Sequence, residues 1–140
     1  MCIRDREDTA SFITHTINQR EKDIHIFGIF FEKKIVGVAG FNGFDKANKR
    51  APIGYWLAES YQGKGLVTSA VKFLLKFGFE TLGINRIEIN CAIENIPSQK
   101  IAQKLGFTQE GIARSAEIID GKILDHKTYS LLKEEYQVDY

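Results

Sequence analysis

The alternation of hydrophobic and polar positions predicts six strands along the chain. The clearest run is 84–92, where Ile87 and Ile89 alternate with Glu88 and Asn90, which is the two-residue period of a strand. The other runs with strand character are 24–31, 34–42, 53–57, 108–119 and 123–132. So many strand-like runs predict that a sheet forms the centre of the fold.

Short polar connections between these runs predict two hairpins. Only Glu32 and Lys33 separate the run 24–31 from the run 34–42. Asp120 and Gly121 lie between the runs 108–119 and 123–132. An aspartate followed by a glycine between apolar runs is a strong signal for a tight hairpin turn. The polar stretch 45–50 is predicted to be a loop.

Three stretches follow the helical period instead. The first begins at Thr9 and repeats apolar residues at helical spacing. The longest, 66–82, has one broad apolar stripe and ends near Gly83, which suits a helix C-cap. The third is opened by Pro97 and terminated by Gly106. The predicted order is helix, three strands, helix, strand, helix and two strands, which is a mixed α/β domain.

Length and composition indicate a single globular domain. The chain has 140 residues, of which 44% are hydrophobic, and this is enough to bury a core. Residues 1–7 follow neither period and are interpreted as a disordered or foreign leader. The domain is therefore expected to occupy residues 8–140.

The charge balance argues against nucleic acid or a membrane as a partner. Nineteen basic and 18 acidic side chains leave a formal charge of +1, so there is no overall field to hold a polyanion or an anionic lipid surface. Two cysteines and three scattered histidines show neither a disulfide framework nor metal-ligand spacing. The longest apolar run is too short to span a bilayer, and no signal-peptide pattern is present. A cytoplasmic protein without a metal is expected.

A glycine-rich turn at 61–68 leads into the longest predicted helix and is the strongest candidate binding site. Gly63 and Gly65 let the backbone approach a ligand closely, and the first amides of the helix have no partner within it. Together with Lys64 and the helix dipole, these amides favour an anion such as a pyrophosphate. The spacing is not that of a nucleotide P-loop, because Ala58 stands where that motif needs a glycine. An ordinary strand-to-helix turn is the alternative.

Two short motifs occur together in this chain. Gln62, Gly65 and Val67 fit the pattern Gln/Arg-x-x-Gly-x-Gly/Ala, except that valine replaces the usual small last residue. Asn-Ile-Pro-Ser at 95–98 and Lys-Leu-Gly-Phe at 104–107 follow after a predicted strand. Both motifs resemble the coenzyme A motifs of GNAT-superfamily N-acetyltransferases of the RimJ/RimL type, which include ribosomal-protein N-terminal acetyltransferases. The similarity covers residues 8–132 and lacks the family's first strand and helix, so an N-terminally truncated domain is expected.

The resemblance implies an α/β (α+β) fold with a mixed, mostly antiparallel central sheet flanked by helices, and acetyl-CoA as the co-substrate. In such folds the strands at 53–57 and 84–92 splay apart, and the pantetheine arm lies in the gap, pairing with exposed backbone. A backbone N–H near Leu57 is expected to polarise the thioester carbonyl. The alternative for Trp56 is a place in the core. The residues expected to contact acetyl-CoA are Trp56, Leu57, Gln62, Gly63, Lys64, Gly65, Val67, Thr68 and Asn95.

The same resemblance implies two catalytic residues. Glu117 follows nineteen positions after Ser98, where a carboxylate of RimL-type enzymes is proposed to accept the amine proton, directly or through water. Ser98 stands where the family places a hydroxyl that protonates or hydrogen-bonds the departing thiolate. A solvent-facing strand position is the alternative for Glu117, and Glu110 is its nearest rival. A helix-start cap is the alternative for Ser98.

The predicted function is transfer of an acetyl group to a primary amine, with a protein N-terminus of the ribosomal-protein type as the favoured acceptor. An α-amino group with a pKa of about 8 is about a tenth neutral at pH 7, whereas deprotonating a lysine of pKa about 10.4 costs about 4.6 kcal/mol. A modest base therefore suffices for an N-terminus. A polyamine or aminoglycoside acceptor, a coenzyme A-binding module without turnover, and a structural interaction domain stay open as alternatives. Assembly as a homodimer stays open too.

Overall fold

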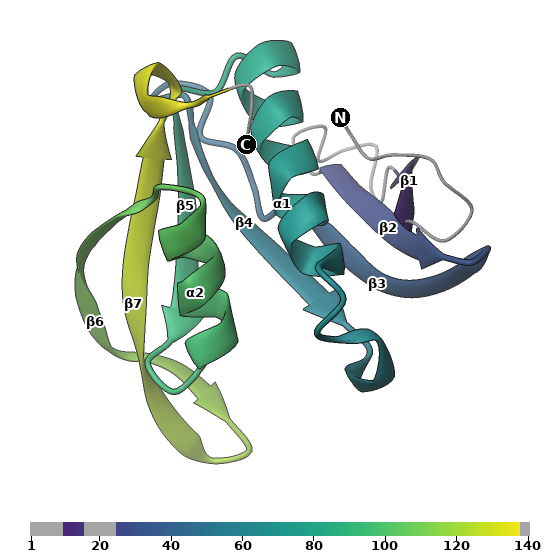
Figure 1. Ribbon diagram of the computed structural model, residues 1–140. Helices are drawn as coiled ribbons and strands as arrows, with labels where there is room; N and C mark the ends of the chain where they lie inside the picture. The colour runs from purple at the N-terminus through teal and green to yellow at the C-terminus, as the bar shows by residue number, and fades with distance from the viewer. Residues whose placement is uncertain (1–9, 16–24, 138–140) are drawn as a thin grey trace.

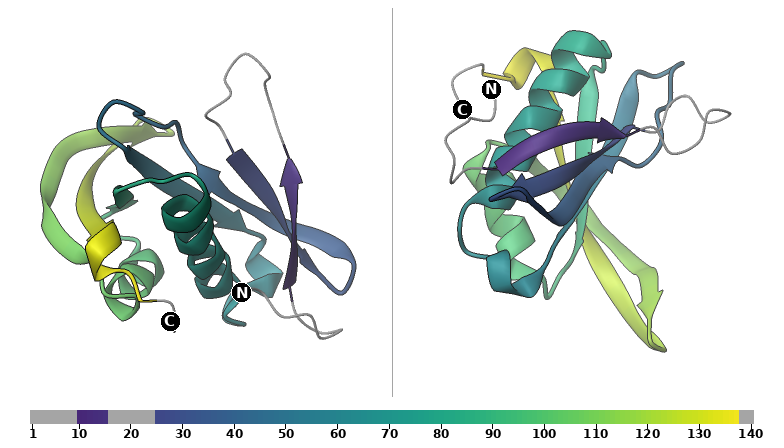
Figure 2. Two further views of the ribbon diagram at one scale, coloured as in Figure 1. Left: turned by 90° about the horizontal axis from the view of Figure 1, so that it is seen from above. Right: turned by 90° about the vertical axis from the view of Figure 1, so that its right-hand side faces the viewer.

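The computed structural model describes residues 10–15 and 25–137. In sheet order, the strands of these residues are β1 (Ala10–His15), β2 (His25–Phe31), β3 (Lys34–Phe41), β4 (Arg50–Leu57), β5 (Arg86–Ala92), β7 (Lys122–Leu132) and β6 (Thr108–Ile119). Neighbouring strands run antiparallel except β4 and β5, which are parallel. Two α-helices, α1 (Leu66–Lys76) and α2 (Ile96–Lys104), lie against one face of this sheet (Figure 1, Figure 2). The predicted mixed, mostly antiparallel sheet is confirmed.

Shorter helical segments connect these elements. A 3-10 helix at Glu59–Tyr61 joins β4 to the glycine turn, and another at Lys133–Glu135 follows β7. A π-helical segment, Phe77–Thr81, continues α1 directly. The predicted helix at 66–82 is therefore present but changes type after Lys76. Gly83, with φ of 70°, follows it in the left-handed conformation expected at a helix end.

The predicted helix beginning at Thr9 is wrong, because residues 10–15 form strand β1. β1 pairs in antiparallel register with β2, and Phe12 lies opposite Ile29. Adjacent aromatic and β-branched residues at positions 12–14 suit a strand as well as a helix, and the edge of β2 supplies the hydrogen-bond partners that decide between them. The remainder of the predicted helix, 16–24, and the predicted leader lie outside the described residues.

Both predicted hairpins are confirmed. Glu32 and Lys33 have φ of 52° and 68°, and Asp120 and Gly121 have φ of 51° and 78°. Positive φ at both central positions is what a type I′ hairpin turn requires. The remaining predicted strands agree with the observed ones to within three residues at each end. The predicted helix that Pro97 opens corresponds to α2 with the same accuracy.

The hydrophobic core fills the space between the helices and one face of the sheet. Ile87 and Ile89 of β5 and Phe41 of β3 are buried there. Gly78 in the π-helical segment allows close packing, since a Cβ would lie 2.9 Å from the Phe41 ring and 3.0 Å from Ile87 Cδ1. On the other face, the large apolar side chains of Ile35, Val38 and Trp56 are exposed.

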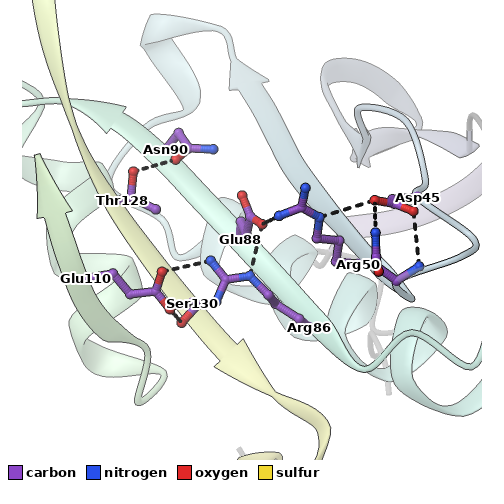
Figure 3. A network of polar contacts seen from close by, with 9 residues as sticks. Asp45, Arg50, Arg86, Glu88, Asn90, Glu110, Thr128 and Ser130 are labelled. Carbon is purple, nitrogen blue, oxygen red and sulfur yellow. Dashed lines mark hydrogen bonds and ion pairs between the residues drawn. The ribbon is translucent and has the colours of Figure 1, made fainter. Parts of the chain in front are cut away.

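A polar network on that other face ties β4, β5, β6 and β7 together (Figure 3). Arg86 donates two hydrogen bonds to the Glu110 carboxylate, at 2.6 and 2.8 Å, and one to Glu88 at 3.0 Å. Ser130 also donates to Glu110, and Arg50 reaches Glu88 at 4.0 Å. The Arg86 guanidinium, helped by Ser130, lowers the pKa of Glu110 from 4.5 to about 2. Glu110 is therefore held ionised in a structural ion pair.

Candidate functional site

The parallel ladder between β4 and β5 is short and leaves a gap beyond its end. The strands pair only from Arg50 and Arg86 to Ile53 and Ile89. Past Ile53, β4 remains paired with β3 along its other edge, and β5 remains paired with β7. The facing edges of β4 and β5 therefore carry backbone that neither strand satisfies.

The last peptide groups of β4 are directed into this gap. Ala58 donates its N–H to the carbonyl of Val36 on β3 at 2.8 Å. Because successive peptide groups of a strand point to opposite edges, those of Leu57 point away from β3 and toward the gap. The Leu57 carbonyl accepts a hydrogen bond from Gln62 Nε2 at 3.2 Å, and its N–H faces the gap.

The glycine turn lies at the N-terminus of α1, as predicted. Gly63 and Gly65 have φ of 82° and 76°, a region that glycine enters without a steric penalty. A Cβ built on either residue would meet nothing within 4 Å, so the space above the turn is open. Gly65 is the N-cap and offers no side-chain cap, which leaves the first amides of α1 oriented toward a ligand.

A cleft of about 460 Å³ opens between the end of β4 and the N-termini of the two helices. Lys64 and Glu117 are the only residues of the predicted site that do not line it. Lys64 instead places its Nζ 5.8 Å from the centre of the Phe31 ring. The predicted residues that line the cleft are Trp56, Leu57, Gln62, Gly63, Gly65, Val67, Thr68, Asn95 and Ser98.

Five lining residues were not among those predicted, and they are Tyr55, Leu66, Pro97, Lys100 and Ile101. The two-residue period of β4 is the signal for Tyr55, because it places this side chain on the same face as Leu57. Trp56 points to the other face and is 63% exposed, so the alternative of a core aromatic is wrong.

Ser98 is held at the start of α2 by two neighbours. Asn95 is the N-cap, and its Oδ1 accepts a hydrogen bond from the Ser98 N–H at 3.2 Å. The Ser98 hydroxyl lies 2.5 Å from the hydroxyl of Tyr55. Asn95 rather than Ser98 caps this helix, so the capping alternative for Ser98 is wrong and its hydroxyl is directed toward β4.

Burial keeps the groups around Ser98 neutral. It raises the pKa of Tyr55, and the hydrogen bond to Ser98 offsets this only in part. Burial also raises the pKa of the Cys91 thiol, with Ser98 and Lys127 acting in the opposite direction. The helix side of the gap therefore holds protonated hydroxyl and thiol groups.

Glu117 lies on the other side of the sheet from the cleft. Its carboxylate is hydrogen-bonded to His126 Nε2 at 2.8 Å. His126 is paired with Ala92 at the end of β5, and the two-residue period of β7 places it on the same face as Thr128 and the polar network. The Glu117–His126 pair thus stands beside the end of β5, where β4 and β5 have separated.

Among the described residues, no cluster of three or more His, Cys, Asp or Glu side chains could hold a metal ion. The helices in this part of the chain lack the combination of length and apolar character that crossing a membrane requires.

The chain is similar to known acetyltransferases along most of its length. The family model described as an acetyltransferase (GNAT) domain matches residues 3–108. The putative ribosomal N-acetyltransferase YdaF of Bacillus subtilis (strain 168) is 36% identical over 110 residues, covering 79% of this chain and 60% of that protein. The ribosomal-protein-serine acetyltransferase of Escherichia coli (strain K12) is 31% identical over 129 residues, covering 91% of this chain and 72% of that protein. The chain thus spans about three-fifths of the length of the first of these relatives.

The fold agrees with that of a solved relative. RimL, the ribosomal L7/L12 α-N-protein acetyltransferase in complex with coenzyme A, matches with a TM-score of 0.77 at 31% identity. This match covers 86% of the present chain and 66% of RimL. The resemblance to RimJ/RimL-type proteins that the two sequence motifs indicated is confirmed.

Proposed function

Because the chain belongs to the GNAT acetyltransferase family, we propose that it transfers the acetyl group of acetyl-CoA to a primary amine. The observation that carries this proposal is the gap between β4 and β5 beside the glycine turn of α1. Strand edges without a partner suit an extended thioester arm, and amides at a helix N-terminus suit its pyrophosphate.

Several residues of the chain fit the parts of acetyl-CoA. The open amides at Gly63 and Gly65 would take the pyrophosphate, and Val67 lines the cleft beside them. Asn95 uses its Oδ1 to cap α2, so its side-chain NH₂ is the group left for the amides of the pantetheine arm. The N–H of Leu57 would hydrogen-bond the thioester oxygen and stabilise the negative charge that develops there.

The two sides of the gap would serve the two reactants. The uncharged amine attacks the carbonyl carbon, the C–S bond breaks with its electron pair going to sulfur, and the amine loses one proton. Ser98 lies on the helix side with the cleft, where the sulfur departs. Glu117, paired with His126 on the opposite face, would take up the amine proton there, directly or through water.

A protein N-terminus is the acceptor we favour. Two of the relatives above are named for ribosomal proteins, and an α-amino group needs only about 1 to 1.4 kcal/mol to be deprotonated at pH 7. The single carboxylate of Glu117, near the end of β5, is sufficient to accept that proton. Deprotonating a lysine acceptor at pH 7 would cost about 4.6 kcal/mol.

Acceptor specificity can be tested with matched amines. Incubation with acetyl-CoA should acetylate lysine-free peptides that have a free N-terminus, detected by mass spectrometry, and should release coenzyme A. Peptides with a blocked N-terminus and one lysine, spermidine and an aminoglycoside serve as competing acceptors. Acetylation of spermidine or the aminoglycoside alone would replace the protein acceptor by a small amine. A rise in melting temperature with acetyl-CoA but no acetylated acceptor would leave only a binding module, and no rise would exclude binding as well.

A further inference from the structure

Tyr55 on β4 and Ser98 at the start of α2 contact each other through their hydroxyl groups. Tyr55 shares the helix-facing side of β4 with Ile53 and Leu57, both of which are buried, because side chains alternate along a strand. Its hydroxyl oxygen is 2.5 Å from Ser98 Oγ. Both residues line the cleft, and Ser98 is only 5% exposed, so the pair borders the cleft and is shielded from bulk water.

The direction of this hydrogen bond follows from the chemistry of the two hydroxyls. A phenol is the more acidic group and the better donor, whereas the serine oxygen has two lone pairs to accept with. The raised pKa of Tyr55 means that the phenol keeps its proton. The neighbouring Cys91 thiol, whose pKa burial also raises, is a weak acceptor when neutral. The Ser98 proton is therefore left for a stronger acceptor in the cleft.

We propose, on the basis of the acetyl transfer proposed above, that Tyr55 is a positioning residue for the leaving group. It donates to Ser98 Oγ and so turns the Ser98 hydroxyl proton toward the departing sulfur. As the C–S bond breaks, its electron pair stays on sulfur and the thiolate accepts a hydrogen bond from Ser98, which keeps its own proton. Because hydrogen bonds in a chain polarise one another, the Tyr55 bond makes Ser98 a stronger donor.

A titration of bound coenzyme A tests this role without an acceptor. The thiolate is followed by its ultraviolet absorbance as pH is raised, with the wild type, Tyr55→Phe, Ser98→Ala and the double variant. The coenzyme A thiol should titrate about one pH unit lower on the wild type than on Tyr55→Phe, a tenfold difference in thiolate stabilisation. The double variant should match Ser98→Ala. Tyr136→Phe, at a tyrosine that does not line the cleft and whose hydroxyl donates to Glu80, should titrate like the wild type.

Turnover gives a second readout that a merely structural role would not produce. Tyr55→Phe should lower kcat about tenfold while changing KM for acetyl-CoA less than about twofold. Losses that multiply in the double variant would show that Tyr55 does not act through Ser98. A fluorinated tyrosine at position 55 is a stronger donor of the same shape, and it should lower the thiol pKa further even if Tyr55→Phe fails to fold.

The outcomes separate this inference from the proposed function. A thiol pKa that depends on Tyr55 with no acceptor acetylated would overturn the transferase proposal and leave the role of Tyr55 intact. Acetylation that proceeds with an unchanged kcat and an unchanged thiol pKa in Tyr55→Phe would overturn the role of Tyr55 alone.

Discussion

At the scale of single residues, the two sides of β5 hold opposite kinds of polar chemistry. The side toward the helices carries Cys91 near Ser98 and Tyr55, all neutral and buried or half-buried. The other side carries Arg86 and Glu88 in an ionised network. Neutral donors suit the stabilisation of a thiolate, and fixed ion pairs suit the anchoring of strands. The alternation of a single strand therefore separates the leaving-group chemistry proposed at Ser98 from the ion pairs that anchor the strands.

Glu110 should make stability depend on pH. Its pKa in the folded protein, about 2, lies below the ordinary 4.5, so its stabilising effect is complete above pH 4.5 and is lost as the pH falls through 2. We expect Glu110→Gln to lower the free energy of unfolding by about 1 kcal/mol at pH 7, a modest value because the pair is partly solvent-screened. Urea unfolding of both proteins from pH 7 to pH 2 measures the difference, which should shrink across that window. Glu134→Gln, an exposed glutamate, is the control, and a difference independent of pH would contradict the prediction.

Tyr129 should tolerate loss of its hydroxyl. That oxygen is buried and has no hydrogen-bond partner among the described residues, so it loses water on folding without compensation. Tyr129→Phe should leave the free energy of unfolding unchanged or raise it by up to about 1 kcal/mol. Thermal or urea unfolding measures this, and a clear loss of stability would show that the hydroxyl has a partner.

At the scale of elements, local turn chemistry could be read from the sequence, whereas the identity of β1 could not. The type I′ turns at Glu32 and Asp120 follow from short polar connections between apolar runs. The apolar positions around Phe12 fit either period, and only the neighbouring edge of β2, which is a tertiary feature, selects the strand. The glycine turn was predictable because it rests on a few adjacent residues, whereas Ser98 was offered as the cap of α2 and Asn95 caps it.

Replacing Gly65 of the glycine turn by alanine should lower both stability and coenzyme A binding, because alanine is strained at the positive φ of this residue. At φ of 76°, Gly65→Ala should destabilise the protein by about 1 kcal/mol and weaken coenzyme A binding several-fold, because the first amides of α1 lose their orientation. Calorimetric titration and thermal unfolding measure the two effects. Gly111→Ala is the matched control, since a Cβ there also meets nothing within 4 Å but its φ is not positive. Equal effects of the two substitutions would contradict the explanation.

At the scale of the whole molecule, the cleft joins residues from segments far apart in the chain. The motif residues that line it, such as Gln62 and Asn95, could be predicted from short patterns. Tyr55 lies outside both motifs, and its contact with Ser98 spans 43 positions of sequence. The ion pair between Arg86 and Glu110 is also a product of strand register. Contacts of this kind are set by the sheet, and no local pattern specifies them.

Hydrogen exchange should reveal the unpaired edge of β4. The Leu57 amide faces the gap, whereas the adjacent Ala58 amide is bonded to Val36. In the free protein Leu57 should exchange much faster than Ala58. Acetyl-CoA, whose thioester oxygen would accept from the Leu57 N–H, should slow Leu57 by about tenfold more than it slows Ala58. Two-dimensional NMR in deuterated buffer measures both amides in one experiment. Equal protection of the two amides without ligand would contradict the inferred orientation.

The short parallel ladder from Arg50 to Ile53 has a mechanical consequence. It is the only direct strand contact in the described residues between strands β1–β4 and strands β5–β7, so the sheet consists of two parts joined along one short edge. The π-helical segment Phe77–Thr81 packs against both parts, since Gly78 lies against Phe41 of β3 and Ile87 of β5. Under the proposed function, a thioester arm lodged between the two parts of the sheet would brace them against each other, and binding of the donor would then stiffen the protein.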